Sequence, residues 1–423
     1  MLNTIKIDEI YDANIEGLEN EGAGVCKING MVVFVPKALT GEKVRIRIIE
    51  IKKNYAKGKV IEVLEKSKHR VDSGCPYYEE CGGCNLRHQD SKENLKFKKE
   101  KVENAIKRIG KLDIKVNDVV SSFRDDNYRN KASFKVENNK IGFYSEGTYQ
   151  LVDIKECKLM KKEINDSLYY IRKYLEENKN EIKNVTVKYG NAMNEILIDI
   201  YSVNESDINI CDFLINNLPS LKTIIFNDKI VYQNGYISQI INGLMFNCSA
   251  KSFFQVNDMQ AEKLYNLAIK SANLKESDTV LDLYCGTGTI SCIVSSHVKK
   301  VIGVEIVEDA VRDAKCNLMI NNINNVKFIV GDAAKKVSKI KEKVDVIFVD
   351  PPRSGMDRKM ISIIKNIKAK KIVYISCNPV TMARDLNYLS DTYITSKVTP
   401  VDMFPNTAHV ECVSVLHRKS LEK

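Results

Sequence analysis

The sequence contains no run of eighteen apolar residues, no internal repeat and no low-complexity tract. A membrane-spanning helix needs about 20 consecutive apolar residues, so none is expected here. The segment from Met1 to Ile10 alternates polar with apolar side chains and therefore lacks the apolar region of a secretory signal peptide. These absences predict a soluble, cytoplasmic protein with no membrane partner.

Length, charge and cysteine content narrow the class further. At 423 residues the chain exceeds the size at which a single core stops growing, so two or three domains are expected. The net charge of +10 favours an anionic partner such as nucleic acid, although an excess of lysine also serves solubility. Twelve cysteines in a chain without a secretion signal argue against disulfides, because the cytosol keeps thiols reduced. Their positions must decide between metal binding, catalysis and core packing.

The first 65 residues contain short alternating runs with glycines at the joints, such as Met31 to Val35 and Glu42 to Ile49. This pattern predicts a small β-barrel. Tyr55 offers a ring for stacking, and the exposed faces would carry Lys37, Lys43, Arg45, Arg47, Lys52, Lys53, Lys57 and Lys59. An oligonucleotide-binding barrel uses such residues, but an ordinary solvated β-domain also fits.

The next segments are less specific. A basic, helix-like stretch runs from Leu95 to Lys111, and its lysines could contact phosphates or simply form a solvated face. Residues 113 to 245 look mixed α/β, with strand-like runs from Lys131 to Val136 and from Ile196 to Tyr201 around a helical stretch from Lys161 to Lys179. Pattern alone assigns them no function.

From Lys251 onward, apolar strand-like runs alternate with helix-like segments. The expected strands are Val280–Leu283, Val301–Ile306, Val326–Val330, Val344–Val349 and Ile372–Ile375. This alternation predicts a doubly wound, mostly parallel sheet of the Rossmann type, with ligands bound beyond the carboxyl ends of the strands.

Two glycines follow the first of these strands. Gly286 and Gly288 would let the backbone turn tightly and approach a bulky ligand, and Glu305 ends the next strand, where a carboxylate can accept ribose hydroxyl protons. The combination fits a dinucleotide or S-adenosylmethionine. No third glycine precedes Cys292 and no extra basic residue awaits a pyrophosphate, which favours the methyl donor. A purely structural glycine turn is the remaining alternative.

Two further strand ends carry reactive groups. Asp350-Pro351-Pro352 resembles the motif with which amino-methyltransferases hold a planar target, but Arg353 stands where those enzymes have an aromatic residue. The cysteine 25 residues beyond Pro352, Cys377, follows an apolar run that breaks at a proline, which suggests a covalent route instead. A buried structural thiol is the alternative for Cys377.

Methylation at carbon 5 of uracil would explain a cysteine and a base together. That carbon is a weak nucleophile until a thiolate adds to carbon 6, and the adduct resolves only when a general base removes the carbon 5 proton. Glu411 is the best candidate base, because strand alternation places it on the same face as Val413 and Val415, where burial strengthens a carboxylate as a base. An exposed edge-strand glutamate is the alternative, and His409 is a rival base.

Taken together, these motifs resemble the RNA uracil-5-methyltransferase family. The matching segments are Tyr128–Lys131, Ser252–Asn257, Asp282–Gly286, Asp350–Arg353, Ser376–Pro379 and Glu411. The N-terminal barrel is similar to that family's RNA-binding TRAM domain. The resemblance implies that Cys377 is the nucleophile, that Glu411 removes the proton, and that S-adenosylmethionine is bound by Gln255, Tyr284, Glu305 and Asp350. Thr289 stands where the family often has asparagine.

Cys75, Cys81 and Cys84 form a Cys-x5-Cys-x2-Cys array, and Cys157 lies far enough along the chain to return as a fourth ligand. Four thiolates suit tetrahedral zinc or a [4Fe-4S] cluster, and spacing alone slightly favours zinc. The array resembles that of iron–sulfur-bearing members of the family, which implies a [4Fe-4S] cluster with a structural or RNA-positioning role. The other seven cysteines are most simply small core residues.

The sequence thus predicts an α/β protein in three parts: a TRAM/OB-like β-barrel (1–65), a mixed α/β central domain with the cluster loop (66–248) and a Rossmann-like methyltransferase domain (249–423). The resemblance implies a monomer that makes 5-methyluridine in 23S ribosomal RNA, the target being a loop or flipped-out uridine. The alternatives are transfer-RNA methylation, a non-catalytic RNA-binding protein of ribosome assembly, and an iron–sulfur redox protein using a dinucleotide.

Overall fold

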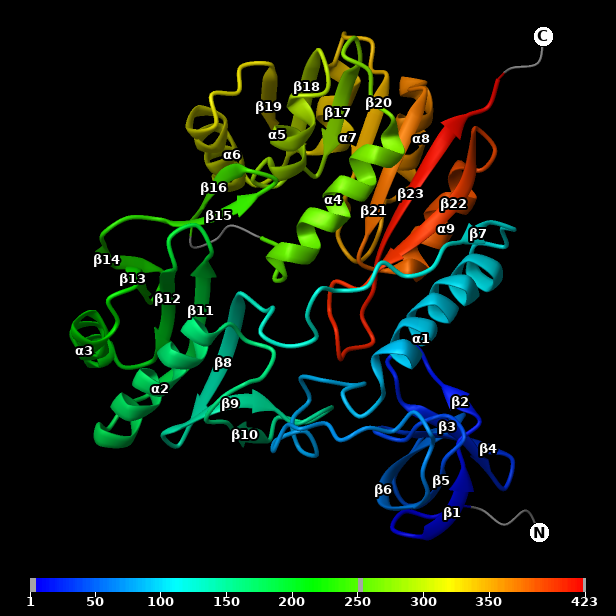
Figure 1. The fold of residues 1–423 in the computed structure, drawn as a ribbon, viewed down its shortest axis with the longest axis vertical. Helices are drawn as coiled ribbons and strands as arrows, with labels where there is room; N and C mark the ends of the chain where they lie inside the picture. Colours follow the sequence, from blue (N-terminus) through cyan, green and yellow to red (C-terminus); the bar gives the residue numbers. More distant parts are fainter. Residues whose placement is uncertain (1–4, 250–253, 421–423) are drawn as a thin grey trace.

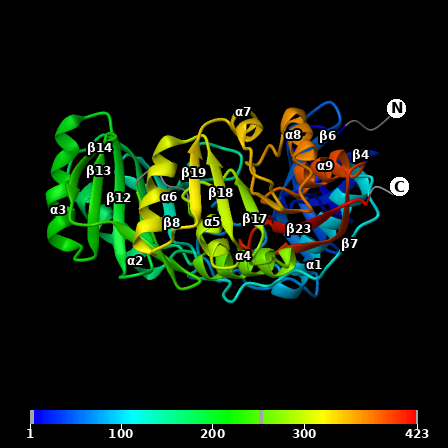
Figure 2. The same cartoon turned by 90° about the horizontal axis from the view of Figure 1, so that it is seen from above.

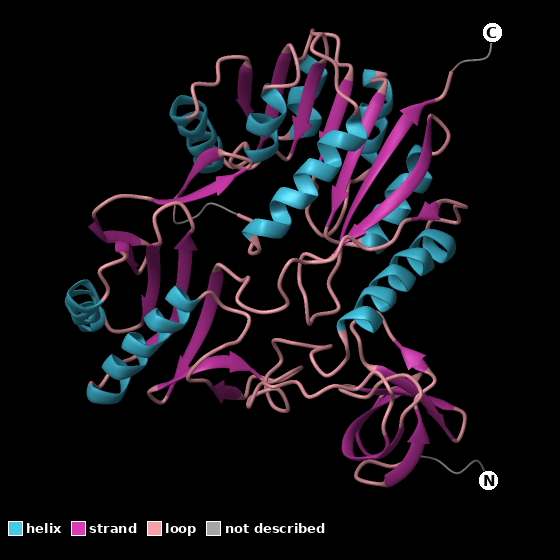
Figure 3. Ribbon diagram, in the orientation of Figure 1, coloured by secondary structure: helices cyan, strands magenta, loops and turns pink. Residues whose placement is uncertain are grey.

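The computed structural model describes residues 5–249 and 254–420. It contains three main sheets joined by α1 and by long loops, which gather where the three sheets approach one another (Figures 1 and 3). Ser252 and Phe253, part of a predicted motif, lie outside the described residues. No helix in the described part of the chain is long and apolar enough to cross a membrane.

The N-terminal sheet has six strands in the order β1-β5-β6-β4-β3-β2 and curls around one apolar core, as the sequence predicts. In β5 the residues alternate: Val44, Ile46 and Ile48 are fully buried, while Arg45 and Arg47 face outward. The bounds are β1 Ile10–Asn14, β2 Gly17–Leu18, β3 Gly24–Ile28, β4 Met31–Val35, β5 Lys43–Ile51 and β6 Tyr55–Glu65.

Helix α1 (Ser91–Asn104) connects this sheet to the rest of the molecule and ends in a π-helical turn, η1 (Ala105–Ile109). It begins four residues before the predicted start because the Asp90 side chain accepts from the Glu93 backbone N–H and caps it. Its lysines do not form one phosphate-binding face: Lys98 is completely buried, and Lys99 pairs with Asp118. A role for Lys98 in binding phosphates is therefore wrong.

The central unit is a seven-stranded sheet in the order β10-β9-β8-β11-β12-β13-β14, with α2 and α3 packed into its apolar core. The predicted strands and helix of this region are found close to their expected bounds. The strands are β8 Lys131–Glu137, β9 Lys140–Tyr144, β10 Leu151–Asp153, β11 Ile182–Gly190, β12 Glu195–Ser202, β13 Leu221–Phe226 and β14 Lys229–Gln233. The helices are α2 Lys162–Glu177, η2 Glu205–Asn209 and α3 Ile210–Asn217. A two-stranded ribbon, β15 Ile237–Ile241 with β16 Leu244–Cys248, leads on to the C-terminal unit.

The C-terminal unit is an eight-stranded sheet in the order β19-β18-β17-β20-β21-β23-β22-β7. The first five of these strands run parallel, and β23 inserts antiparallel beside β21. The strands are β7 Lys115–Val116, β17 Thr279–Leu283, β18 Lys300–Glu305, β19 Val326–Val330, β20 Val346–Val349, β21 Lys371–Ser376, β22 Tyr393–Val401 and β23 Glu411–Arg418. The predicted Rossmann-like sheet is confirmed.

Helices cover both faces of this sheet: α4 and α5 lie on one side, and α7, α8 and α9 on the other (Figure 2). Alternate residues of one strand therefore enter different cores, Val280 packing with the α4 side and Leu281 with the α8 and α9 side. The helices are α4 Asp258–Ala272, α5 Thr289–Ser295, α6 Glu308–Ile320, α7 Ala333–Lys336, η3 Val337–Lys339, α8 Arg358–Ile367 and α9 Pro379–Leu389.

Candidate functional site

The carboxyl ends of four neighbouring strands form one edge of the C-terminal sheet. In the ladder, Leu283 of β17 lies between Val304 of β18 and Val349 of β20, and Val349 is paired in turn with Tyr374 of β21. Tyr284, Asp350 and Cys377 immediately follow three of these strands, and Glu305 ends the fourth. The structure thus brings together four of the predicted site residues that lie far apart in the sequence.

The turn after β17 is shaped by left-handed backbone at Tyr284 (φ 63°), Gly286 (φ 52°) and Gly288 (φ 80°). A side chain at Gly288 would also collide with Phe328, 2.6 Å from a Cβ there, so the glycine is required on both counts. One carboxylate oxygen of Glu305 accepts from the Gly286 N–H at 3.0 Å. Glu305 is therefore held against the glycine turn, where a nucleoside ligand would lie.

Gln255 enters the site from the segment before α4. Its side chain is hydrogen-bonded to Tyr265 of α4, whose hydroxyl is buried near the Asp350 and Glu411 carboxylates. The backbone of this segment is held by Asn130, whose side-chain amide donates to the Gln255 carbonyl at 3.1 Å and whose N–H donates to Val256 at 2.9 Å. The central unit therefore helps to position the Gln255 segment.

Asp282 is a buried carboxyl within β17 to which the sequence analysis gave no role. One of its oxygens accepts from the Ser291 hydroxyl at 2.6 Å, and the other has no hydrogen-bond partner within the described part of the chain. Burial raises the pKa of Asp282 to about 7. A charged residue in the middle of an apolar strand was a visible signal, because buried carboxyls are rare without a function.

Cys377 lies in a negatively charged setting. Burial raises the pKa of its thiol to about 11, and the Glu411 and Asp350 carboxylates add to the rise, whereas Arg353 opposes it. Glu411 is the first residue of β23, next to Cys412, which pairs with Ser376 of β21, so the two predicted catalytic residues are brought together.

Glu411 is the stronger of the two predicted bases. Its side chain is only 2% exposed, and burial raises its pKa to about 8, with a further rise from Asp350 and a lowering by Arg353. Burial lowers the pKa of His409, the rival, to about 4. A base near pKa 8 accepts a proton at neutral pH far more readily than one near 4, so the geometry and charge favour Glu411.

A network of hydrogen bonds fastens the loop after Asp350 to the nucleophile's own turn. The Arg353 carbonyl accepts from the Asn378 amide at 3.1 Å and from the Thr381 hydroxyl at 3.2 Å. Asp385 of α9 accepts from the Met356 N–H at 2.8 Å and from the Tyr374 hydroxyl at 2.7 Å with the same oxygen. These bonds hold the carboxylate-bearing loop and the thiol-bearing turn against each other.

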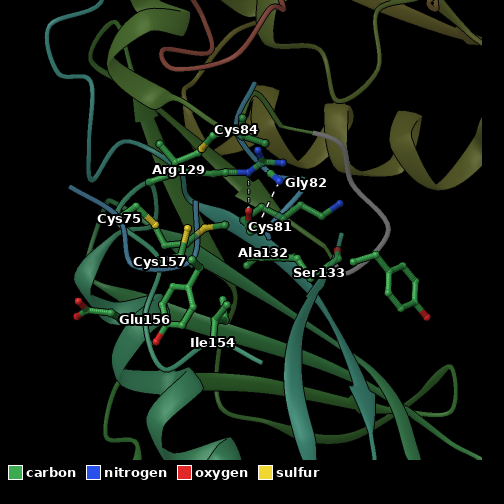
Figure 4. Close-up of a pocket in the computed structure, with 18 of the residues that line it drawn as sticks. Cys75, Cys81, Gly82, Cys84, Arg129, Ala132, Ser133, Ile154, Glu156 and Cys157 are labelled. Carbon is green, nitrogen blue, oxygen red and sulfur yellow. Dashed lines mark hydrogen bonds between the residues drawn. The ribbon is translucent and has the colours of Figure 1, made fainter. Parts of the chain in front are cut away.

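The four cysteines of the predicted cluster line one cavity of about 460 Å³ in the central unit. Figure 4 shows their side chains around a common space, with Cys84 on the side nearer Arg129. Burial raises the pKa of Cys84 to about 12 and of Cys157 to about 11, and the neighbouring thiols Cys75 and Cys81 add to both rises. Four thiols gathered from two separate loops are a donor set that soft metal centres prefer.

No group of three or more His, Cys, Asp or Glu side chains within residues 5–249 and 254–420 is arranged to hold a metal ion. The four thiols share a cavity without closing on one point. In a [4Fe-4S] cluster the four thiolates bind the cluster as a whole rather than one central ion, so the donor set and the room fit that group.

A doubly wound sheet, a glycine turn after its first strand and a carboxylate ending the second are features of domains that bind a nucleoside-containing ligand, among them the S-adenosylmethionine-dependent methyltransferases. The family model described as tRNA (Uracil-5-)-methyltransferase matches residues 90–419, and the TRAM domain model matches residues 6–61. The chain belongs to this RNA uracil-5-methyltransferase family and carries a TRAM domain, which confirms the resemblance found in its motifs.

Relatives of similar length support this assignment. The chain is 39% identical to an uncharacterized RNA methyltransferase of Caldanaerobacter subterraneus subsp. tengcongensis, over 99% of this chain and 100% of the relative. It is 35% identical to an uncharacterized RNA methyltransferase of Clostridium tetani, over 97% of each chain. Among solved structures, the Pyrococcus abyssi tRNA (uracil-54, C5)-methyltransferase in complex with S-adenosyl-L-homocysteine matches with a TM-score of 0.78 at 25% identity, covering 96% of this chain and 100% of that one.

Proposed function

We propose that the protein transfers a methyl group from S-adenosylmethionine to carbon 5 of a uridine in 23S ribosomal RNA, giving 5-methyluridine. The observation that carries the proposal is the convergence of Cys377 and Glu411 beside the strand ends that form the nucleotide-type pocket. A thiol and a buried carboxyl at that place suit a covalent methylation better than a direct transfer to an amine.

The chemistry would proceed in three steps. Cys377 adds as a thiolate to carbon 6 of the uracil, and the electron pair released makes carbon 5 nucleophilic. Carbon 5 then takes the methyl group from the sulfonium, whose sulfur keeps the bonding pair. Glu411 removes the proton from carbon 5, the double bond re-forms between carbons 5 and 6, and the thiolate of Cys377 leaves.

In this scheme Cys377 must lose its proton before it adds to the uracil, and Glu411 must be ionised before it removes the carbon 5 proton. Free Cys377 is a thiol at neutral pH, so its proton must leave as the uracil binds. Asp350 and Glu411, whose pKa values burial raises to about 6 and about 8, are the nearby groups that exchange protons in the neutral range. In this proposal Gln255, Tyr284, Glu305 and Asp350 bind S-adenosylmethionine.

The cavity lined by Cys75, Cys81, Cys84 and Cys157 would hold a [4Fe-4S] cluster. No step of the methylation is an oxidation or a reduction, so the cluster would serve structure or RNA placement. For the same reason a redox enzyme using a dinucleotide is not favoured. We further propose a cytoplasmic monomer with parts 1–65, 66–248 and 249–423, the first of which helps to bind RNA through its basic face.

Transfer RNA is the second candidate substrate. The full-length match to the Pyrococcus abyssi tRNA enzyme favours it, because that enzyme has a similar fold over 96% of this chain. The likeness of the cysteine array to that of iron–sulfur-bearing family members favours ribosomal RNA, whereas the barrel does not separate the two candidates, because a match over 96% of this chain includes most of it. The two candidates share every chemical step and differ only in the RNA presented.

One incubation separates these possibilities. Anaerobically purified protein is given methyl-labelled S-adenosylmethionine and, in separate reactions, unmodified ribosomal or transfer RNA, and the RNA is digested to nucleosides for mass spectrometry. Label in 5-methyluridine from ribosomal RNA alone is the expected result. Label from transfer RNA alone would overturn the substrate and keep the chemistry. Label in neither would favour a non-catalytic RNA-binding protein.

A further inference from the structure

The loop that joins β22 to β23, residues 402–410, lies where the three sheets of the molecule approach one another (Figures 1 and 3). Its two ends are close together, because Val401, the last residue of β22, pairs with Glu411, the first residue of β23. Any shift of this loop therefore acts directly on the backbone that carries the proposed base.

Helix α1 holds the first half of the loop through Lys98. The Lys98 ammonium pairs with the Asp402 carboxylate and donates to the Phe404 carbonyl at 2.9 Å, and the Lys98 side chain has no exposed area. Burial lowers the pKa of Lys98 and raises that of Asp402, because desolvation disfavours both charges. Such a buried ion pair adds little net stability compared with apolar residues of the same size. Stability alone therefore does not explain why Lys98 and Asp402 occupy these positions.

The same helix ties the end of the loop to the N-terminal sheet. The Lys101 ammonium donates to the Ala408 carbonyl at 2.9 Å and to the Asn20 carbonyl at 2.6 Å. Ala408 also packs with Leu86 and Phe97 in a small apolar cluster. Lys98 and Lys101 thus fix the loop to α1, and Lys101 also links it to the N-terminal sheet.

The remaining contacts reach the other two functional regions. The Tyr128 hydroxyl donates to the Pro405 carbonyl at 3.1 Å, and the Asn257 side chain, two residues beyond Gln255, donates to the Met403 carbonyl at 3.1 Å. The Leu86 N–H, two residues beyond Cys84, donates to the Asn406 carbonyl at 3.1 Å. Loop 402–410 therefore contacts the barrel by way of Lys101, the cysteine loop and the Gln255 segment.

We propose that Lys98 is a positioning residue for proton removal: by fixing loop 402–410 it holds the Glu411 carboxylate in place over carbon 5 of the uridine attached to Cys377. The inference rests on the proposed function and deepens it. Lys98 acts on the base and not on the nucleophile, because Cys377 belongs to the β21–α9 turn, which Asp385 and Asn378 hold separately.

This assignment predicts which step suffers when Lys98 is lost. Addition of Cys377 and methyl transfer precede proton removal, and the bond from Cys377 to carbon 6 breaks only when the carbon 5 proton leaves. A displaced Glu411 therefore leaves methylated RNA covalently attached to the protein. A merely structural loss would lower formation and release of the adduct together.

The test is a single-turnover experiment with labelled S-adenosylmethionine and the RNA that the wild type methylates. Label is followed in the covalent protein–RNA adduct on denaturing gels and in released 5-methyluridine. Lys98→Met is expected to slow release by about tenfold, a cost of about 1.4 kcal/mol, while adduct formation changes little. Lys99→Met is the matched control, since Lys99 is the next residue on α1 and its pair with Asp118 is exposed.

If Lys98→Met unfolds, two milder variants still test the inference. The double variant Lys98→Met, Asp402→Asn leaves no unpaired buried charge, and Tyr128→Phe removes only the hydroxyl that donates to Pro405. Both should shift label toward the adduct, Tyr128→Phe the less. If the ratio of released 5-methyluridine to covalent adduct stays at the wild-type value in every folded variant, the inference is overturned. A wild type that makes no 5-methyluridine would instead overturn the proposed function.

Discussion

Two regions of the molecule hold thiols that differ in number and in their charged neighbours. Cys377 is a single thiol at a strand end, where the nearest charges that affect its pKa most are the carboxylates Glu411 and Asp350. The four cysteines of the central cavity lie on loops, and there the neighbouring thiols raise the pKa of Cys84 and Cys81, while Arg87 and Lys37 lower it. Burial raises the pKa of the thiol in both regions.

The two regions differ in how their thiols would lose the proton on sulfur. In the proposed function the negative neighbours keep Cys377 a thiol until a uracil binds, and the carboxyl groups then take and return its proton. Four thiols that line one cavity suit thiolates that stay ionised on a metal centre. In the proposed function the same residue type is a reagent in one region and a ligand in the other, so variants of each should fail differently.

Replacing the reagent should have the largest effect. Cys377→Ser is expected to lower methylation by on the order of 10⁴-fold or more, because no covalent activation of carbon 5 remains. Formation of 5-methyluridine with labelled methyl donor measures this, and thermal unfolding should be unchanged. Cys316→Ser, a half-buried thiol on α6, is the matched control and should methylate normally. Substantial turnover by Cys377→Ser would contradict the covalent mechanism.

Loss of the base should stop the reaction later. Glu411→Gln is expected to lower turnover by about 10²–10⁴-fold, the usual worth of a general base. Unlike Cys377→Ser, it should retain labelled RNA bound to the protein on denaturing gels. Glu411→Asp, which keeps the carboxyl, should recover part of the release. An unaltered release rate in Glu411→Gln would transfer the role of base to another group.

The raised pKa of Glu411 gives two pH effects of opposite sign. The proton-removal rate should rise as pH increases through about 8, because only the ionised carboxyl is a base. The free energy of unfolding should fall over the range from the ordinary glutamate pKa up to about 8, since there the folded state holds a proton that the unfolded state releases. Glu411→Gln should remove that fall, which thermal unfolding at pH 6 and pH 9 measures. An identical pH dependence in both proteins would contradict the buried carboxyl.

Much of this comparison was visible in the sequence. The parallel strands were predicted because apolar runs at even spacing end in turn residues, and strand ends then brought Tyr284, Glu305, Asp350 and Cys377 to one edge. Alternation predicted only that the Glu411 carboxylate lies on the same strand face as Val413 and Val415, and its position beside β21 is known from the fold. Local pattern is enough when the fold class fixes which strand ends are neighbours.

Contacts between distant segments were not visible. Lys98 reads as one more lysine in a basic helix, and only the fold places it against Asp402, 304 residues away in the chain. Asp385 looks like a polar residue on a surface helix, yet it is fully buried and holds the Met356 loop. Periodicity shows which face of a helix is apolar, but not which charged residue will find a partner inside.

Replacing a ligand should have a smaller effect than replacing the reagent. Cys84→Ser is expected to lose iron, measured by metal analysis and by the visible absorbance of the cluster, while Cys377→Ser retains it. Methylation should fall mainly through weaker RNA binding, by about tenfold or 1.4 kcal/mol, with little change in the single-turnover rate at saturating RNA. A Cys84→Ser protein without iron that folds and methylates normally would remove the structural or RNA-positioning role of the cavity.

The smallest effect is expected at the barrel, far from both thiol sites. Arg47 and Lys59 are exposed and directly opposite each other across β5 and β6, a pair of like charges that an RNA phosphate would relieve. The double variant Arg47→Ala, Lys59→Ala should weaken RNA binding and lower the slope of log affinity against log salt by roughly 1–2, as expected for two lost phosphate contacts. Arg45→Ala is the control, because the Arg45 guanidinium is already paired with Asp12 at 2.8 Å and with Glu62 at 3.3 Å. The single-turnover rate at saturating RNA should stay at the wild-type value in both variants. If Arg45→Ala lowers the salt slope as much as the double variant does, the barrel binds RNA through a different face.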